Sequence, residues 1–273
     1  MRTSISEAKA CDFIIGLIYE RCRIRLHEGK EPLIRARLGR RMRLHGHEYL
    51  EDYCHFLQND APDEEFTEVV DALTTSYTKF LREPDHFEFM VQRALPAVLA
   101  DGRRKFRVWS AACATGEEPY SIAFYLAEHF PPAQGWDWRV VGTDVSTKAL
   151  KQAREGVYPL ERAGTVPPEW LKRHCQRGTG EFEGRFRIRP ELAGRVEFEN
   201  LNLLEELSFA EPFDLIFCRN VMIYFDRATQ EQLATSLARF LVPDGYLLTG
   251  HAESLTGLRV PLKCEQPSIY RKL

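Results

Sequence analysis

Residues 106–129 read FRVWSAACATGEEPYSIAFYLAEH. The first five residues suit a short buried strand, the small residues AACATG suit a tight turn, and a helix is expected from about Glu117 to His129. A strand, a tight turn and a helix in this order are typical of sites for nucleotide-like ligands. The turn has a single glycine, Gly116, so it is not the G-x-G-x-x-G dinucleotide pattern, and the absence of G-K-[ST] after it excludes a phosphate-binding loop.

Acidic side chains around this turn indicate the charge of the ligand. Glu117 and Glu118 stand where the helix begins, and they would repel a phosphate but attract a cationic group. Asp144 ends the next predicted strand, residues 138–144, where a carboxylate can accept hydrogen bonds from ribose hydroxyls. A ribose and a positive charge without a phosphate indicate S-adenosylmethionine. The alternative is that Glu117 only caps its helix and Asp144 only caps its own turn.

The segments on either side continue the alternation of strands and helices. Further strands are expected at 213–218 and 246–249, and further helices at 146–155, capped by Ser146, and at 226–241. This order predicts an α/β fold with a doubly wound parallel sheet. Residues 156–200 interrupt the alternation with several glycines and the alternating run RFRIR, which predicts a small antiparallel insertion; an ordinary long loop is the alternative.

The first eighty residues show helical periodicity, and no strand is expected there. Four amphipathic helices are predicted from apolar residues spaced by three and four. The residues that mark them are Phe13, Leu17, Ile18 and Arg21; Ile34, Leu38 and Met42 after Pro32; Tyr49, Tyr53, Phe56 and Leu57; and Phe66, Val69, Val70 and Leu73 after Asp63.

The composition of the 273 residues is that of a globular protein. Hydrophobic residues make up 44% and charged residues 28%, which excludes a disordered, collagen-like or membrane-embedded chain, and the net charge of −3 argues against bulk attraction to nucleic acid. The seven cysteines form no C-x-x-C pair, and His45, His47 and Cys54 lack a fourth ligand, so neither a disulfide framework nor a metal site is expected. The N-terminus lacks a signal-peptide layout, which predicts a cytoplasmic location.

Two more polar stretches flank the predicted sheet, a hydroxyl-rich run before it and CRNVMIYF after the strand at 213–218. Together with the segments above they form five ordered motifs, and these resemble the CheR family of chemotaxis receptor glutamate methyltransferases over nearly the whole chain. The motifs are TTSYTKFLREPDHF (74–87), VWSAACATGEEPYSIA (108–123), VVGTDVSTKAL (140–150), FDLIFCRNVMIYF (213–225) and DGYLLTGHAESL (244–255).

The resemblance implies a domain organisation and a cofactor site. Residues 1–83 would form an N-terminal helical receptor-recognition domain, and residues 84–273 a class I S-adenosylmethionine-dependent methyltransferase domain with an inserted β-subdomain at about 156–200. Two positions depart from the family pattern, because relatives often carry asparagine at Ser76 and serine or glycine at Cys113. The cofactor-binding residues implied are Ser76, Thr78, Arg82, Glu117, Asp144, Asn202, Leu203, Arg219 and Asn220.

The resemblance also implies the reaction. The methyl group of S-adenosylmethionine is transferred to a receptor glutamate, which gives a γ-methyl ester and S-adenosylhomocysteine. A carboxylate with a pKa of about 4.3 is already deprotonated at neutral pH, so no general base is needed. Arg82 and Tyr224 are the candidate catalytic residues, which would orient carboxylates. For His251 and Glu253 in GHAES, hydrogen bonding within the structure is expected rather than a catalytic role.

The distribution of charge predicts partners. Residues 20–45 contain nine basic and three acidic residues, a net charge of +6, with Arg37, Arg40 and Arg41 on one helix face. A solvated surface and nucleic-acid binding are alternatives. The resemblance favours docking of this face on the cytoplasmic helices of methyl-accepting chemoreceptors.

The resemblance also relates residues 171–189, with Gly178, Gly180 and Arg187, to a β-subdomain that binds a peptide at the receptor C-terminus.

The remaining expectations concern what the chain does not do. We expect a monomer with no nucleic-acid partner and no insertion into a membrane. A nucleic-acid methyltransferase is disfavoured because RNVMIY (219–224) replaces the Asn-Pro-Pro-aromatic motif that orients a base amino group. A cofactor-sensing adaptor that docks on receptors without catalysis is the non-enzymatic alternative.

Overall fold

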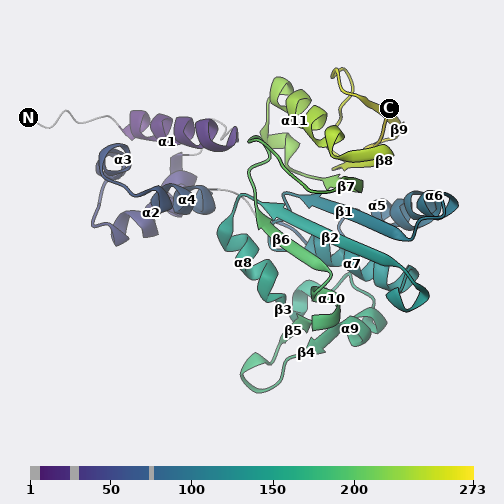
Figure 1. Cartoon of the computed structure of the whole chain (residues 1–273). Coiled ribbons are helices and arrows are strands. Elements are labelled where there is room, and N and C mark those ends of the chain that lie inside the picture. The colour runs from purple at the N-terminus through teal and green to yellow at the C-terminus, as the bar shows by residue number, and fades with distance from the viewer. Residues whose placement is uncertain (1–6, 25–30, 74–76) are drawn as a thin grey trace, which may run out of the picture. The chain divides into compact units, whose positions relative to one another are not determined.

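The computed structural model describes residues 7–24, 31–73 and 77–273, and the chain divides into two compact units (Figure 1). The first unit comprises Met1–Thr75 and Tyr224–Asp226, and the second comprises Ser76–Ile223 and Arg227–Leu273. Phe80 is fully buried in the second unit, with its ring centroid 5.0 Å from that of Tyr158. The division at residue 75 therefore leaves Phe80 and its neighbours with the sheet, whereas the sequence prediction places the boundary at residue 83.

The first unit is helical, with α1 (Glu7–Cys22), α2 (Glu31–Leu44), α3 (Leu50–Asn59) and α4 (Asp63–Leu73). The α2 prediction is confirmed, since Ile34, Leu38 and Met42 are its buried residues. The buried face of α1 differs from the expected one, because Ile14 and Ile18 are buried whereas Arg21 is exposed. The residues that complete this face are small, Ala10 and the cysteines at 11 and 22, and small residues contribute little to a hydrophobic pattern.

A buried polar cluster links α2, α3 and α4. Glu65 is only 3% exposed and accepts hydrogen bonds from the side chains of Arg41 and Tyr53, with His45 Nε2 at 2.9 Å from its Oε2 atom. Arg37 donates to the carbonyl oxygen of Leu73 at 2.9 Å. Of the three arginines expected on a basic face, Arg40 is exposed, whereas Arg37 and Arg41 are half-buried and bond within the unit.

The second unit is built on a seven-stranded sheet with the order β6-β2-β1-β7-β8-β10-β9 (Figure 1). The first five strands pair in parallel, which confirms the predicted α/β fold, while β10 is antiparallel to both of its neighbours. The register aligns Ala111 with Thr143 on one side and with Cys218 on the other, so the carboxyl ends of these strands lie at one level. The strands are β1 (Lys105–Ala111), β2 (Asp137–Asp144), β6 (Val196–Asn200), β7 (Phe213–Cys218), β8 (Leu241–Thr249), β9 (Leu262–Gln266) and β10 (Ile269–Lys272).

Helices cover the sheet, and alternate residues of the strands face two apolar layers. Phe106 and Val108 of β1 join a core with Phe124 of α7, whereas Trp109 packs on Phe213 from the other face. The predicted bounds of α7 are confirmed, and Ser146 caps α8 by accepting the N–H of Ala149 at 3.1 Å. The helices are α5 (Pro84–Phe89), α6 (Leu95–Ala100), α7 (Glu117–His129), α8 (Thr147–Glu155), α9 (Pro168–His174), α10 (Pro190–Ala193) and α11 (Arg227–Arg239). A short π-helix, Met90–Ala94, joins α5 to α6.

The predicted antiparallel insertion is present as a three-stranded sheet of β3 (Val157–Pro159), β5 (Arg185–Ile188) and β4 (Cys175–Arg177), in that order. It shares the main core, because Tyr158 and Phe186 both pack on Phe80. The main sheet resumes at Val196, where β6 pairs with β2 inside the range assigned to the insertion from sequence. Within the described residues, none of the helices has the length and apolarity that a membrane crossing requires.

Candidate active site

The turn after β1 is held in a tight conformation against the end of β2. Its residues Ala112, Ala114 and Gly116 all have positive φ angles, and the N–H of Cys113 bonds to the carbonyl oxygen of Thr143 at 2.8 Å. A Cβ atom at Gly116, where φ is +92°, would lie 2.8 Å from the Cβ atom of Ala153. Glycine is therefore required at this position, both for its backbone angle and for the approach of α8.

Asp144 fixes this turn to the end of β2. Its Oδ2 atom accepts the N–H of Ala114 at 2.8 Å, and its Oδ1 atom accepts the N–H of Ser146 at 2.9 Å. The carboxylate is half-buried at the carboxyl edge of the sheet, as the sequence predicts. A carboxylate can accept about four hydrogen bonds, and hydroxyl groups are among the donors that it binds.

The two glutamates at the start of α7 are both engaged with protein partners. Glu117 is fully buried and accepts hydrogen bonds from Thr115 and from Arg162. Glu118 accepts from the Ser110 hydroxyl at 2.7 Å and from Arg219 at 3.0 Å. Burial raises the pKa of Glu118, and the guanidinium of Arg219 opposes that effect. The sequence predicts a cofactor contact for Glu117, and the structure adds that its carboxylate is oriented by Arg162.

Arg219, which follows β7, joins three segments of the second unit. Its side chain is 1% exposed, and its donors reach the carboxylates of Glu83 and Glu118 and the carbonyl oxygen of Arg82. Its guanidinium also lies 5.7 Å from the ring centroid of Phe87, within the range of a cation–π contact. Arg219 therefore positions the segment of residues 82 and 83 beside the start of α7.

Glu83 is a site residue that the sequence reasoning missed. It has a positive φ of 53° and precedes Pro84, the first residue of α5. Burial raises its pKa, but the guanidinium of Arg219 outweighs burial, so the pKa of Glu83 lies below its usual value. Its unusual backbone angle before a proline is a local signal, whereas its pairing with Arg219 has no signature in the sequence.

The hydroxyl-rich run is described from Tyr77 onward, so Ser76 lies outside the described residues. Thr78 is half-buried, and Arg82 is half-buried with its Nε atom 3.8 Å from Glu83 Oε1. Arg82 also lies near the ring of Tyr77, with 6.0 Å between the guanidinium carbon and the ring centroid. The structure thus brings Arg82 next to the buried cluster of Glu83 and Arg219 while leaving its side chain partly exposed.

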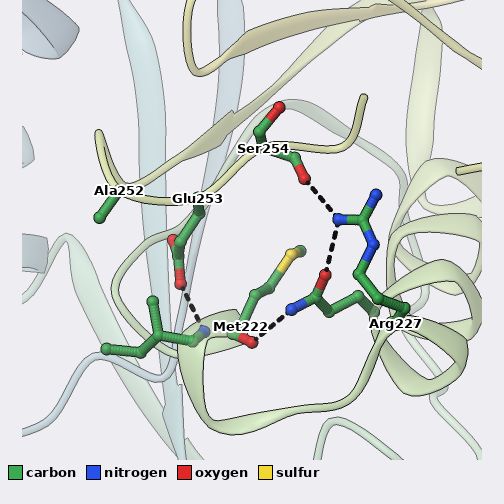
Figure 2. A pocket seen from close by; sticks show the side chains of 7 residues that line it. Met222, Arg227, Ala252, Glu253 and Ser254 are labelled. Atoms are coloured by element: carbon green, nitrogen blue, oxygen red, sulfur yellow. Dashed lines mark hydrogen bonds between the residues drawn. The ribbon is translucent and has the colours of Figure 1, made fainter. Parts of the chain in front are cut away.

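Glu253 holds the loop after β7 to the loop after β8. This buried carboxylate accepts the backbone N–H groups of Gly250 at 2.6 Å, Asn220 at 2.8 Å and Ile223 at 3.1 Å, the last of which is drawn in Figure 2. Burial raises the pKa of Glu253, and these N–H groups oppose the rise. The expected structural hydrogen bonding of Glu253 is confirmed, and Asn220 is fixed at the sheet edge through its backbone.

A cavity of about 270 Å³ lies beside Glu253 (Figure 2). Arg227 and Gln230 of α11 line it together with the loop after β8, and Arg227 donates to the carbonyl oxygen of Ser254 at 3.0 Å. None of the predicted cofactor residues lines this cavity. The cavity is therefore separate from the edge formed by Gly116, Asp144 and Arg219.

The remaining predicted residues lie in two loops. Leu203 is buried, and Asn202 donates to Glu205 Oε1 at 3.0 Å while its own side-chain oxygen accepts the N–H of Leu204. Both follow β6, whose last residue, Asn200, pairs in register with Asp144.

Tyr224 ends a 3₁₀ turn, Met222–Tyr224, and groups with the first unit, so its catalytic role beside Arg82 stays a prediction.

Comparison with known proteins identifies the family. Residues 9–74 match the CheR methyltransferase all-alpha domain, and residues 76–270 match the CheR methyltransferase SAM binding domain. A chemotaxis protein methyltransferase of Salmonella typhimurium is 43% identical over 94% of this chain and 88% of its own length, and one of Escherichia coli is 40% identical over the same shares. Another, of Borreliella burgdorferi, is 35% identical over 95% of this chain and 92% of its own length.

These matches agree with the geometry of the sheet edge. The second unit has the fold of class I S-adenosylmethionine-dependent methyltransferases, preceded in the chain by an all-helical domain. S-adenosylmethionine is accordingly the methyl donor of this enzyme. The chain belongs to the CheR methyltransferase family.

Proposed function

We propose that this enzyme transfers a methyl group from S-adenosylmethionine to glutamate side chains in the cytoplasmic domains of chemoreceptors, in chemotactic adaptation. The observation that carries the proposal is the sheet edge of Gly116, Asp144 and Arg219, which lies inside the region matching the CheR methyltransferase SAM binding domain. Relatives that are 35–43% identical to this chain are chemotaxis protein methyltransferases. The enzyme would accordingly work in the cytoplasm.

The residues of this edge fit the donor. The half-buried carboxylate of Asp144 suits ribose hydroxyls, and the carboxylates of the buried Glu117 and the half-buried Glu118 give the edge the negative character that a sulfonium cation needs. When bound, S-adenosylmethionine supplies an activated methyl group on a positively charged sulfur. The other proposed contacts come from the segments around this edge, and they are Ser76, Thr78, Arg82, Asn202, Leu203, Arg219 and Asn220.

The chain's own residues would contribute orientation rather than proton transfer. The acceptor glutamate is deprotonated at neutral pH, since its pKa is about 4.3, so no general base is required. Arg82 is half-buried, and its contacts with Glu83 at 3.8 Å and with the carbonyl oxygen of Tyr77 at 3.5 Å are both long, which leaves its guanidinium able to meet an incoming carboxylate. Arg219 is buried and bonded to two carboxylates, so its role is to position Arg82 and Glu118. Alignment of this kind can contribute about 7–11 kcal/mol at best.

Receptor docking would use two surfaces. In the first unit, Arg40 is exposed on α2 and presents positive charge to acidic receptor helices. In the insertion, β4 is an edge strand, and an extended peptide can add to such a strand through main-chain hydrogen bonds. Arg187 is exposed on the neighbouring β5, where it could pair with acidic peptide residues. Gly178 shapes this hairpin, because its N–H bonds to the carbonyl oxygen of Arg185 at 2.8 Å.

The proposed reaction is tested by incubating the full chain and methyl-labelled S-adenosylmethionine with a receptor cytoplasmic domain. We expect label on glutamate that alkali releases as methanol, because an ester is hydrolysed. Arg82→Ala should reduce the rate at least tenfold, whereas Lys79→Ala, an exposed neighbour, should not. Label that survives alkali, or label on nucleic acid, would support the nucleic-acid alternative. Cofactor binding without turnover would support the adaptor.

Peptide docking is tested separately by calorimetry with a receptor C-terminal pentapeptide. We expect binding that Arg187→Ala weakens and that the exposed β6 variant Glu197→Ala leaves unchanged. An absence of heat at millimolar peptide would eliminate the peptide contact without affecting the proposed chemistry.

A further inference from the structure

Three potential metal ligands converge next to the proposed active site. Glu83 precedes α5, His86 lies in α5, and His251 follows β8. Each offers one ligand atom, and these three atoms lie within 4.8 Å of one another. The ring centroids of His86 and His251 are 5.0 Å apart, and the two rings are arranged edge to face. Glu83 and His86 belong to one short segment, whereas His251 is far from them in sequence. The fold of the second unit brings His251 to the other two residues.

His86 is oriented in a way that exposes a lone pair to this cluster. It is fully buried, and its Nε2 atom lies 2.8 Å from the hydroxyl oxygen of Ser268. That hydroxyl donates its own proton to the carbonyl oxygen of Pro267 at 2.6 Å, so it can only accept from His86. The proton of the neutral ring is therefore on Nε2, and Nδ1 carries a lone pair.

This lone pair has no hydrogen-bond partner. The Nδ1 atom of His86 is buried and unsatisfied, and it lies 3.6 Å from the Oε2 atom of Glu83, another acceptor. Two acceptors that face each other in a buried site repel, and a cation bound to Nδ1 and to this carboxylate reduces the repulsion.

The other two residues have the surroundings of metal ligands. His251 Nε2 lies 2.9 Å from Asp85 Oδ2, and a carboxylate that orients a histidine is typical of the outer shell of a metal site. Arg219 holds Glu83 Oε2, while Glu83 Oε1 has only long contacts, with Asn220 at 3.4 Å and with Arg82 at 3.8 Å. Oε1 is thus the oxygen that a metal would recruit.

We infer that Glu83, His86 and His251 form a binding site for a divalent transition metal, with Zn²⁺ as the best-suited ion. Two histidines and one carboxylate are a common ligand set for Zn²⁺ and for other first-row metals. Ligands about 2.0 Å from a tetrahedral metal are about 3.3 Å apart, so the cluster must contract by roughly 1.5 Å at most. His251 has a half-exposed side chain and can make this movement, and it also provides a route of entry.

Cobalt uptake by the full chain tests the site, because Co²⁺ substitutes for Zn²⁺ and has a visible spectrum that depends on its ligands. We expect one Co²⁺ per chain with a spectrum of nitrogen and oxygen ligands, and displacement by Zn²⁺. His251→Ala should abolish uptake at micromolar metal, and Asp85→Asn should weaken it about 10–100-fold. His129→Ala is the matched control, since His129 is an exposed histidine of the same unit, and it should bind as the wild type does.

A second readout uses stability. Since a ligand that binds the folded state raises its stability, Zn²⁺ should raise the melting temperature of the wild type and of His129→Ala but not of His251→Ala. The inference is overturned if the wild type takes up no metal or if His251→Ala takes it up equally well. A sulfur-to-cobalt charge-transfer band would also overturn it, because that band would assign the metal to the exposed Cys264. Neither readout requires a receptor, so the proposed function is not at issue in this test.

Discussion

Arg219 donates two hydrogen bonds to the same carboxylate oxygen of Glu83, from Nε at 3.2 Å and from Nη2 at 2.9 Å. These residues are 136 positions apart in the sequence. The pair joins the segment that carries Arg82 to the carboxyl end of β7.

Arg219→Ala should destabilise the second unit. Removal of one partner from a buried ion pair typically costs about 3–5 kcal/mol. In this variant Glu118 loses its ion pair with Arg219, and Glu83 keeps only the long contact with Arg82. Urea unfolding followed by tryptophan fluorescence measures this effect, since all four tryptophans lie in the second unit. Arg239→Ala, an exposed arginine at the end of α11, should change the free energy of unfolding by less than about 1 kcal/mol. Equal effects of the two variants would contradict the assignment.

Asp144→Asn should weaken binding of S-adenosylhomocysteine. A hydrogen bond to a charged group contributes about 1.5–3 kcal/mol, so the affinity should fall about 10–100-fold. Calorimetry measures the affinity, and urea unfolding reports any loss of stability from the amide contacts of Ala114 and Ser146. Asp137→Asn, at the exposed beginning of the same strand, is the matched control and should bind normally. Unchanged affinity in Asp144→Asn would remove Asp144 from the cofactor site.

Gly116→Ala should cost more stability than Gly102→Ala, although both positions have positive φ angles of +92° and +72°. The backbone strain of alanine, about 1–2 kcal/mol, is common to the two variants. Only Gly116 would bring the new Cβ atom against Ala153 and Tyr158, since a Cβ atom at Gly102 meets nothing within 4 Å. Overpacking of this kind adds about 1–3 kcal/mol. Thermal unfolding compares the two, and equal costs would show that the turn can move away from α8.

Acid should destabilise the first unit through Glu65. Burial raises the pKa of this carboxyl, but the side chains of Arg41, Tyr53 and His45 outweigh burial and lower it. A lowered pKa contributes stability above the unfolded value of about 4.3, and this stability is lost as the pH falls through the folded pKa. Hydrogen exchange of peptides from α2 and α4, corrected for intrinsic rates, should therefore show protection that decreases in acid.

Glu65→Gln is the control for that measurement. Glutamine does not titrate, so this variant should be less protected at neutral pH and should lose less protection on acidification than the wild type does. The attribution to Glu65 fails if both proteins lose the same protection across this pH range.

Alkylation of the native chain should modify Cys264 before any of the other cysteines. Cys264 is exposed, and the remaining six are buried. Burial raises the pKa of Cys113 well above its usual value, and the charge of Asp144 adds to the effect, so this thiol in the cofactor turn is unreactive. Mass spectrometry after brief treatment with iodoacetamide identifies the modified residues. Early modification of Cys113 would show that the turn after β1 opens in solution.

The central strands and helices could be predicted from sequence because each has a local signal. Ser146 signals the start of α8, and the short, mainly apolar run of β1 reflects the burial of both of its faces. The strand β9 has no such signal, since four of its five residues are exposed, and the acidic edge strand β6 is also largely solvated. Edge strands of this kind are fixed by their pairing partners rather than by their own composition.

The candidate site was predictable only in part for a similar reason. Asp144 follows a buried strand, so its place at the sheet edge can be deduced from topology. Glu83 and Glu118 meet through Arg219, and pairing between distant charged residues depends on the folded geometry, which no local pattern records. The same limit applies to Arg41, which has the spacing of a surface residue but bonds to the buried Glu65.

The contact between Glu253 and three backbone N–H groups makes the conformation of the loop after β7 independent of its exposed side chains. Because the carboxylate binds main-chain atoms, the loop after β7 keeps its conformation whichever side chain stands at position 223. Ile223 is 46% exposed, so its side chain can be exchanged at little cost in stability. The loop thus separates two tasks, because Glu253 fixes its backbone while the side chain at position 223 can change without moving Asn220.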